Sequence, residues 1–319
     1  MSGHIYKLKT REGDTILPAS VTDAIFNEEG LSLTEILASL ASSQDTRIVD
    51  ESGFFIVDSN GNVAFKVDVN GIDAIQLATS LLNKVKDQIT TDFSSKNVAI
   101  FGDSISCIGS NWVTFFKSKA NFKNVYNFAV GGARWRCGGS AIDLSGTQTG
   151  GDNNNLWNQY NRLNDSISKG TVESPDLVIM FAGTNERYDS DAQLGTADTA
   201  FDSSINYNDM DMPTSDVNNV AKSIRYTVEK TMALCPDAKI VLCTTIPMSD
   251  DPNHIIRRIT NVTRECAYEL GSEVIDLYRN SGIHPVINGT YVLRDGLHTT
   301  DKGSAMIAQV ILSYINKIL

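Results

Sequence analysis

The chain lacks the features that would tie it to a membrane or to nucleic acid. No segment is long and apolar enough to span a bilayer, and the N-terminus, Met1–Lys9, has no apolar core of the kind found in a secretory signal. Basic residues are outnumbered, with 27 Lys and Arg against 38 Asp and Glu and a formal net charge of −11. Phosphate backbones and anionic lipids repel such a chain. We therefore expect no export through the Sec pathway, and neither nucleic acid nor a membrane as a partner.

Cysteine and histidine are too few and too scattered to indicate a metal site or a disulfide framework. The five cysteines form no CxxC pair, so free thiols are expected. The four histidines are dispersed along the chain. Also missing are the zinc motif His-Glu-x-x-His, the phosphate-binding loop Gly-x-x-x-x-Gly-Lys-Ser/Thr and the Gly-x-Ser-x-Gly elbow of α/β-hydrolases. The sequence predicts neither a metal nor any other cofactor.

Length and composition fit one sizeable catalytic domain with a smaller appendage. The chain has 319 residues, of which 41% are hydrophobic and 20% charged, as in ordinary globular proteins. The pattern of residues changes near position 95. We therefore predict an N-terminal α+β appendage over residues 1–95 and a catalytic domain over residues 96–319.

The appendage is expected to contain a β-hairpin between two helices. Apolar residues recur at helical spacing over 31–40 and 74–89. Between them, two β-rich runs within 53–68 flank Asn60-Gly61, which is a strong hairpin pattern. A unit of this size builds only a thin core. The apolar stripes of its helices are therefore expected to pack on the catalytic domain, or on copies of themselves in a homo-oligomer.

From residue 96 onward, short apolar runs alternate with helical stretches. This alternation predicts a parallel sheet with helices on both faces, joined by right-handed crossovers. The long polar stretch 186–212 is expected to be a loop that shapes a binding rim. The expected strands are 97–101, 124–129, 176–181, 239–244 and 273–277, and the expected helices lie near 110–120, 154–169, 214–234, 253–270 and from 300 or 301 to 319.

Chemically useful residues stand after three of these strands. Ser104 follows the first strand in the run Gly-Asp-Ser, Gly132 ends a glycine pair after the second, and Asn185 follows the third. Parallel strands bring such residues to one edge of the sheet. Asp295 and His298, just before the last helix, are spaced so that the carboxylate can bond the imidazole, as a base histidine requires. Each residue alone has an ordinary explanation as a turn, cap or solvated residue, but together, in this order, they favour a catalytic site.

This ordered set resembles the SGNH (GDSL-like) hydrolase family over about residues 96–319. The resemblance implies a flavodoxin-like three-layer α/β/α sandwich with a five-stranded parallel sheet, and the hydrolysis of esters through an acyl-serine intermediate. It makes Ser104 the nucleophile, His298 the general base and Asp295 the partner that orients it. It also implies an oxyanion hole formed by the backbone N–H groups of Ser104 and Gly132 and by the side-chain amide of Asn185.

The segment after the glycine pair bears on which ester is cleaved. Arg134 and Trp135, followed by Arg136, can line a substrate rim that contacts a sugar or an anionic group. The alternative is that Trp135 packs inside and the arginines are solvated. Glu186 stands where the family often has aspartate, which bears only on local substrate contacts. Since no broad apolar run marks a long acyl pocket, we expect a carbohydrate O-acetyl esterase, with a lipase or lysophospholipase as the alternative.

Roughly the first 80 residues resemble the N-terminal segments of phage tail and receptor-binding proteins. The resemblance rests on residues 16–18 and 23–33 and on the hairpin run Phe55–Asp68. It implies a virion-associated enzyme with other virion proteins as partners and bacterial surface glycans as substrates; a cytoplasmic location in the bacterial host is the alternative. The rival function is a non-catalytic receptor-binding or structural virion protein that keeps a hydrolase fold.

Overall fold

The computed structural model describes six short strands within the first 91 residues and, beyond them, residues 92–319 apart from 108–110, 138–143, 145–153, 205, 208–216, 250 and 252–253. Contacts between residues divide the chain into two compact units, Met1–Thr90 and Thr91–Leu319. The domain border predicted between residues 95 and 96 lies a few residues further along and remains a prediction.

The N-terminal unit contains a four-stranded antiparallel sheet. The predicted hairpin is confirmed, because β4 (Gly53–Val57) pairs antiparallel with β5 (Val63–Asp68). β3 (Thr46–Asp50), which was not predicted, pairs with β4, and β6 (Gly71–Ile72) pairs with β5. A separate pair is formed by β1 (Leu8–Lys9) and β2 (Thr15–Ile16). The helices predicted over 31–40 and 74–89 lie outside the described residues.

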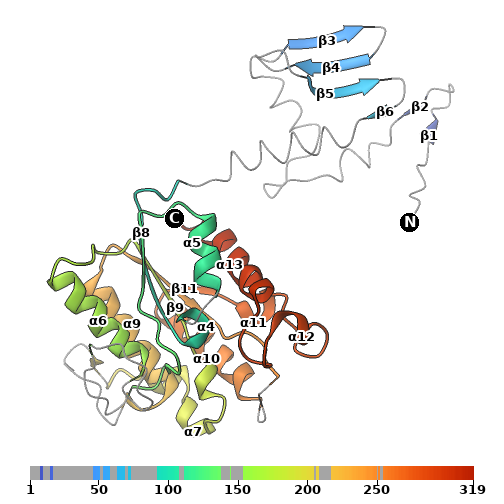
Figure 1. Ribbon diagram of the computed structural model, residues 1–319. Coiled ribbons are helices and arrows are strands. Elements are labelled where there is room, and N and C mark those ends of the chain that lie inside the picture. Colours follow the sequence, from blue (N-terminus) through green and yellow to red (C-terminus); the bar gives the residue numbers. More distant parts are fainter. Residues whose placement is uncertain are drawn as a thin grey trace. The chain divides into compact units, whose positions relative to one another are not determined.

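The C-terminal unit is built on a five-stranded parallel sheet (Figure 1). In space the strands follow the order β8-β7-β9-β10-β11. Counted along this unit, the order is 2-1-3-4-5, which is the flavodoxin-like arrangement. Each strand overlaps a predicted one, so the predicted fold class is confirmed. The strands are β7 (Asn97–Gly102), β8 (Asn124–Asn127), β9 (Leu177–Phe181), β10 (Lys239–Cys243) and β11 (Glu273–Ile275).

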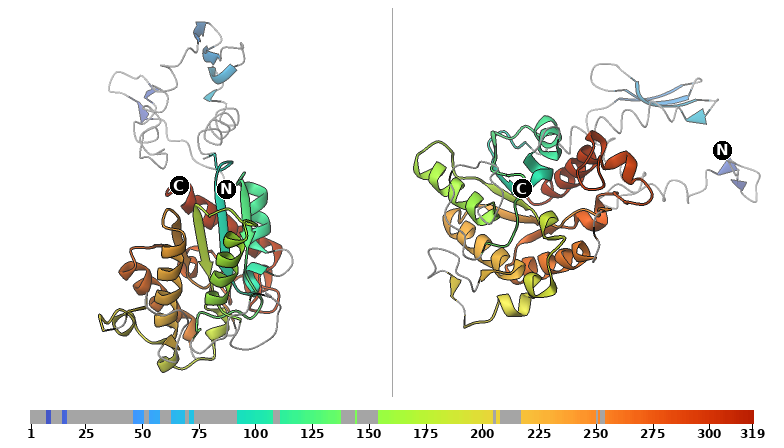
Figure 2. Two further views of the ribbon diagram at one scale, coloured as in Figure 1. Left: turned by 90° about the vertical axis from the view of Figure 1, so that its left-hand side faces the viewer. Right: turned by 60° about the horizontal axis from the view of Figure 1, so that its bottom comes forward.

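Helices cover both faces of this sheet (Figures 1 and 2). One face is covered by α5 (Trp112–Lys119) and α13 (Asp301–Ile315). The other is covered by α6 (Leu156–Ser168), α9 (Val220–Leu234) and α10 (Ile255–Glu269). These five helices all overlap predicted ones. The one-turn helices α4 (Ser104–Cys107), α11 (Leu277–Asn280) and α12 (Gly289–Val292) were not predicted.

The sequence of β7 explains why helices cover both faces of the sheet. Successive side chains of a strand point to opposite faces. Val98 and Ile100 therefore pack with α5 and α13, whereas Ala99 and Phe101 pack with α6, α9 and α10. All four side chains are completely buried. A strand buried on both faces needs an apolar residue at every position, which accounts for the unbroken apolar run in the sequence.

The stretch 186–212 is not the plain loop that was predicted. It contains α7 (Asp191–Leu194) and α8 (Ala197–Ala200), each of which begins with a capping box. In the first box, Ser190 and Gln193 cap each other. Both helices pack against α9 and α10 and bury their apolar side chains there. Among the polar residues of this stretch, Ser190 and Thr196 are helix caps, and Asp191 and Asp198 lie in the first turns of the two helices.

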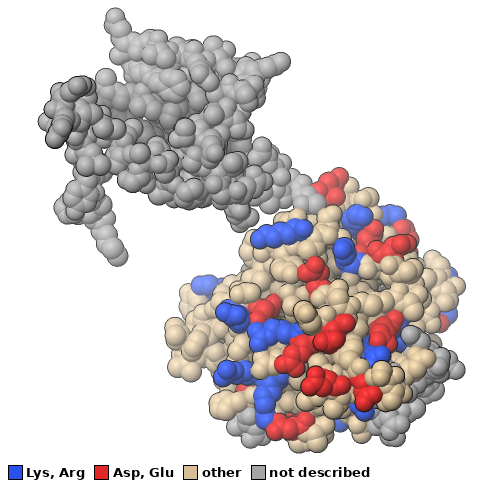
Figure 3. Space-filling model, turned by 180° about the vertical axis from the view of Figure 1, so that it is seen from behind, with Lys and Arg blue, Asp and Glu red and all other residues tan. Residues whose placement is uncertain are grey.

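The surface shows charges of both signs. On the face of the C-terminal unit seen in Figure 3, acidic and basic side chains are intermixed and do not gather into a patch of one sign. None of the described helices combines the length and the apolar character that a bilayer crossing requires.

Candidate active site

Ser104 lies at the carboxyl end of β7, where the strand order reverses. β8 and β9 flank β7, and open α/β sheets bind ligands outside the strand ends at such a point. Gly102 makes the turn into α4 possible. A Cβ at this position would lie 2.6 Å from Ser106 Oγ and 2.9 Å from the carbonyl oxygen of Phe181. Only glycine fits there, and Ser104 then begins α4.

Gln159 fastens this turn and was not identified from the sequence. It is completely buried on α6. Its side-chain oxygen accepts the Gly102 N–H at 2.7 Å, and its amide donates to the Gly102 carbonyl at 2.7 Å. The same carbonyl accepts the Val130 N–H at 3.1 Å, which ties the loop after β8 to the end of β7. The backbone before Ser104 is therefore fixed both by α6 and by the loop after β8.

His298 and Asp295 lie on a tight hairpin that precedes α13. The Arg294 N–H donates to the His298 carbonyl at 2.7 Å, and Gly296 within the hairpin has a φ of 79°, which glycine adopts without strain. Asp295 Oδ1 accepts the backbone N–H groups of Leu297 at 3.1 Å and His298 at 2.7 Å. The other oxygen, Oδ2, lies 2.7 Å from His298 Nδ1.

The imidazole of His298 connects this hairpin to Ser104. His298 Nε2 lies 2.9 Å from Ser104 Oγ, so carboxylate, imidazole and hydroxyl form one continuous chain. Partial burial raises the pKa of the Asp295 carboxyl, but the hydrogen bonds from His298 and Leu297 outweigh it and bring the pKa to about 2. The carboxylate is therefore ionised at neutral pH. It can hold a proton on Nδ1 and leave the lone pair of Nε2 facing the serine.

Gly132 and Asn185 come to the same edge of the sheet on two neighbouring loops. Gly132, with a φ of 77°, lies in the turn after β8 that the bond from the Ala133 N–H to the Val130 carbonyl closes at 3.1 Å. Asn185 lies in the 3₁₀ turn η1 (Thr184–Glu186) after β9. Its side-chain amide donates to the Ala133 carbonyl at 2.8 Å. Because an amide carries two N–H groups, this bond orients the group and leaves a second donor.

Trp135 does not line a substrate rim. Its side chain is completely buried in the core beside α6, α9 and α10, which corrects the prediction that it contacts substrate. The chain forms a bridge between Arg134 and Asn155 at this point, and this pairing turns Trp135 inward. The arginines on either side pair with Asp189 instead. The side chain of Arg134 is 37% exposed, so its contact with substrate remains a prediction.

Two buried carboxyl groups adjoin the site, and sequence reasoning assigned a catalytic role to neither. Asp103, beside Ser104, is completely buried, and burial raises its pKa to about 6 although hydrogen bonds and the nearby His298 oppose the shift. Glu186, beside Asn185, is also completely buried, and burial raises its pKa to about 7. An acidic residue after a strand looks like a turn residue in sequence, since its burial depends on distant parts of the chain.

The raised pKa of Asp103 predicts that the stability of the protein decreases as pH rises. The folded protein binds this proton more tightly than the unfolded chain, so the free energy of unfolding should decrease as pH rises from about 4 to about 6. With a pKa of about 6 against the ordinary 3.8, this decrease amounts to about 3 kcal/mol. Asp103→Asn cannot ionise, yet it keeps an acceptor for the Ile105 N–H, which Asp103 Oδ1 binds at 2.9 Å.

Urea unfolding of the parent and of Asp103→Asn across this pH window measures the effect. The variant should show the weaker pH dependence. The contribution of Glu186 is common to both proteins and cancels in the difference. Equal pH dependence in the two proteins would contradict the assignment to Asp103.

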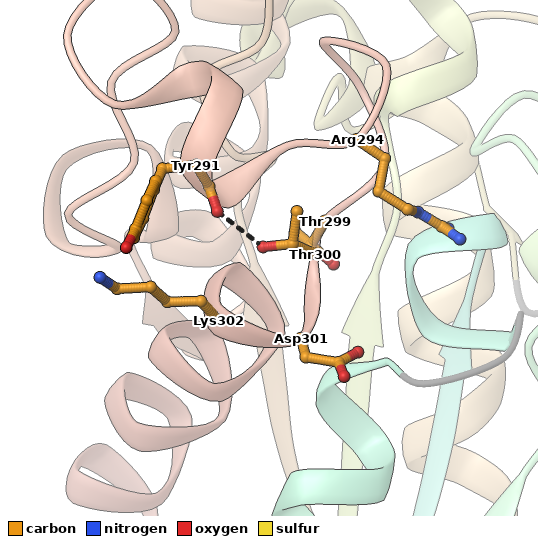
Figure 4. A pocket seen from close by; sticks show the side chains of 6 residues that line it. All are labelled: Tyr291, Arg294, Thr299, Thr300, Asp301 and Lys302. Carbon is orange, nitrogen blue, oxygen red and sulfur yellow. Dashed lines mark hydrogen bonds between the residues drawn. The ribbon is translucent and has the colours of Figure 1, made fainter.

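A cavity of about 590 Å³ lies beside the hairpin that carries Asp295 and His298 (Figure 4). Among its lining residues, Arg294 directly precedes Asp295 in the sequence and Thr299 directly follows His298. The others come from α12 and the start of α13. Figure 4 shows the side chains of Arg294 and Lys302 on opposite sides of the threonines. The Lys302 ammonium lies 4.2 Å from the centre of the Tyr291 ring. The lining residues are Tyr291, Arg294, Thr299, Thr300, Asp301 and Lys302.

Potential metal ligands do not cluster in the part of the chain that the structure describes. There, no three His, Cys, Asp or Glu side chains lie close enough together to hold a metal ion. The five cysteines are free thiols, as predicted, and four of them are buried.

The chain matches the family model of GDSL-like lipases and acylhydrolases over residues 98–311. One similar solved structure is 21% identical, has a TM-score of 0.51, and covers 72% of this chain and 99% of its own. A lipase/acylhydrolase from Enterococcus faecalis is 19% identical, with a TM-score of 0.44 and coverage of 70% of this chain and 97% of its own. A GDSL-like lipase from Bacteroides uniformis is 16% identical, with a TM-score of 0.47 and coverage of 70% of this chain and 96% of its own. At these identities the solved structures bear on the fold alone. No curated protein matches the chain.

The matched segment runs from β7 into α13. It includes Ser104, Gly132, Asn185, Asp295 and His298 and covers two thirds of the chain. The resemblance of the first 80 residues to phage tail proteins gains no support from these matches. The chain belongs to the GDSL-like lipase/acylhydrolase family of hydrolases.

Proposed function

We propose that this protein is a serine esterase that works through an acyl-serine intermediate. The observation that carries the proposal is the chain of hydrogen bonds from Asp295 through His298 to Ser104, with steps of 2.7 and 2.9 Å. A serine hydroxyl is a weak nucleophile until a neighbouring base takes its proton. His298 Nε2 is within reach of that proton, and the family match supports the same class of reaction.

The reaction has two halves. In the first, Ser104 Oγ attacks the carbonyl carbon of the ester while His298 Nε2 takes the hydroxyl proton. The bond to the alcohol then breaks, and the imidazolium gives this proton to the leaving alcohol. In the second half, His298 takes a proton from water as the water attacks the acyl-serine. The acid leaves, and the proton returns to Ser104. Asp295 stays ionised throughout and stabilises the imidazolium.

The negative charge that develops on the carbonyl oxygen requires donors that are already in place. The proposed donors are the backbone N–H groups of Ser104 and Gly132 and the amide of Asn185. The bond from Asn185 to the Ala133 carbonyl supports this role, because it fixes the direction of the amide before a substrate arrives. Losing one such donor typically costs about 100- to 1000-fold in turnover.

We place the substrate among O-acetylated glycans. The cavity beside the hairpin supports a polar substrate, since its lining has two cations, a carboxylate, two threonine hydroxyls and an aromatic ring. A hydroxyl-rich sugar can hydrogen-bond such groups and pack on the ring. The resemblance of the first 80 residues to phage tail proteins is the reason to expect this glycan on a bacterial surface, with the enzyme attached to a virion, and it remains a prediction.

A lipase-type activity is the second candidate. It is favoured by Val286 and Ile287 in the loop before α12, which are 89% and 80% exposed. Exposed apolar side chains near a site can contact an apolar ligand. They lie a few positions before Tyr291, which lines the cavity.

Acyl-chain preference separates the two candidates. If the substrate is an O-acetylated glycan, the protein should release acetate from an acetylated polysaccharide. It should also cleave a chromogenic acetyl ester with a kcat/KM at least about tenfold above that for the dodecanoyl ester, because a site shaped for acetate rejects added methylenes. Efficient cleavage of the dodecanoyl ester, without acetate release from the polysaccharide, would favour the lipase. Tyr291→Ala is the control: it should impair cleavage of the polysaccharide and spare the small acetyl ester.

A further inference from the structure

The two loops that carry the proposed oxyanion donors are joined by a buried acid. We propose that Glu186 is a positioning residue, which holds the loop of Gly132 at a fixed distance from Asn185 and thereby shapes the oxyanion hole. The inference rests on the proposed function, since it assigns this acid a part in the same site.

Glu186 binds backbone groups of the loop that carries Gly132. Its Oε1 accepts the backbone N–H groups of Trp135 at 2.5 Å and Arg136 at 3.4 Å. The residue before it, Asn185, donates to the Ala133 carbonyl at 2.8 Å. Two successive residues of η1 therefore bind three backbone groups of one loop. One of these groups, the Ala133 carbonyl, belongs to the residue directly after the oxyanion glycine, Gly132.

Asp189 binds the arginine side chains of the same loop. Its side chain is only 5% exposed and pairs with Arg134 Nη1 at 3.3 Å and Arg136 Nε at 2.8 Å. The Asp189 N–H also donates to the Glu186 carbonyl at 2.8 Å, so both acids belong to one short turn. Two acids and two arginines thus lock this turn to the loop of Gly132.

The opposite side of the loop is attached to the start of α6 without help from Glu186. The side-chain amide of Asn154 donates to the Gly131 carbonyl. The backbone of Arg134 bonds to the Asn154 carbonyl and to the Leu156 N–H, each at 3.0 Å. Because these contacts remain when Glu186 is changed, the loop should stay folded. What it would lose is the attachment of Trp135 and Arg136 to Glu186, so that only the bonds from Asn185 and Asp189 still set its spacing to η1.

Glu186 is costly for a residue that only fills space. It is completely buried, and Oε2 has no hydrogen-bond partner among the described residues. Burial raises its pKa to about 7, against the pull of Arg134 and with a further rise from Asp189. An apolar side chain of similar size would avoid this cost. Above a pH of about 7 the carboxyl is ionised, and an ionised acceptor binds backbone N–H groups more strongly than a neutral one, which suits a residue that must hold a loop in place.

Three variants test the assignment. Glu186→Ala removes the acceptor, Glu186→Gln keeps the shape and an acceptor without the charge, and Asn185→Ala removes a proposed donor outright. On a chromogenic acetyl ester, we expect kcat to fall about 10- to 100-fold in Glu186→Ala and about 3- to 10-fold in Glu186→Gln. Asn185→Ala should set the upper limit, at about 100- to 1000-fold. KM should change by less than about twofold, since the loss concerns the transition state.

A second measurement tests the geometry directly. An alkyl boronic acid forms a tetrahedral anion on the serine, and its affinity should fall in parallel with kcat across the three variants. Titration of Ser104 to completion with a fluorophosphonate counts the folded sites, so that kcat is expressed per competent serine. Glu229→Gln, an acid that pairs with Arg225 on its own helix at 2.7 Å, is the matched control and should keep the parental kcat.

The outcomes are distinct. A kcat per titrated serine within about twofold of the parent in the Glu186 variants, or a loss that appears only in KM, would overturn the positioning role. If Glu186→Ala does not fold, Glu186→Gln decides alone. A parent that neither turns over the ester nor reacts with the fluorophosphonate would instead overturn the proposed function.

Discussion

Ser104→Ala is expected to lower turnover of a chromogenic acetyl ester by on the order of 10⁵- to 10⁶-fold and to leave the fold intact. The change removes the oxygen that attacks the carbonyl, so that only binding and the oxyanion donors remain. Initial rates measure the turnover, loss of fluorophosphonate labelling shows that the nucleophile is gone, and circular dichroism tests the fold. Parental turnover by the variant would contradict the acyl-serine mechanism. An inactive parent that does not react with the probe would instead favour the rival function, a non-catalytic receptor-binding protein.

Ser106→Ala is the matched control, two positions along α4. The Ser106 hydroxyl accepts the indole N–H of Trp112 at 2.9 Å, and both residues are completely buried. This variant should keep its turnover but lose about 1–3 kcal/mol in the free energy of unfolding, because a buried donor is left unpaired. If Ser104→Ala loses turnover but keeps its stability, and Ser106→Ala keeps turnover but loses stability, then the loss of activity in Ser104→Ala comes from the missing nucleophile. Loss of turnover in both would show that the turn after β7 had been disturbed.

The strands could be predicted because a sheet that is buried on both faces requires unbroken apolar runs. β7, β9 and β10 have such runs, and the residues that follow parallel strands meet at one edge of the sheet. This placed Ser104 and Asn185 near each other from the sequence alone. The spacing of Asp295 and His298 indicated a bonded pair, but only the family resemblance made His298 the base of Ser104. Nothing in its local sequence states that its ring lies 2.9 Å from a serine 194 positions earlier.

The contacts that support the site could not be predicted, for a physical reason. Trp135 stands between two arginines, and the sequence does not say which side of this segment faces the core; the pairing of Arg134 with Asn155 decides it. Gln159 and Glu186 bind backbone groups of distant loops. A backbone group has the same donor and acceptor whatever its residue type, so no pattern of side chains marks such a partner.

Asp295→Asn is expected to block catalysis by reversing the tautomer of His298. In the parent, Asp295 Oδ1 accepts the backbone N–H groups of Leu297 and His298, and Oδ2 faces Nδ1. In the variant the amide oxygen must take the place of Oδ1, because only an acceptor fits two N–H groups. This directs the NH₂ group at Nδ1. An amide that donates to Nδ1 leaves the ring proton on Nε2, which faces Ser104 and can then no longer take the serine proton.

Turnover by Asp295→Asn should therefore fall by roughly 10³- to 10⁴-fold. Asp295→Ala is the matched control and should lose less. The side chain of Asp295 is 54% exposed, so its removal opens Nδ1 to water, which can accept a proton there and permits the productive tautomer. Rates per titrated Ser104 give the comparison. An Asn variant that is as active as the Ala variant, or more active, would contradict the tautomer argument, because simple loss of the carboxylate charge lowers both rates alike.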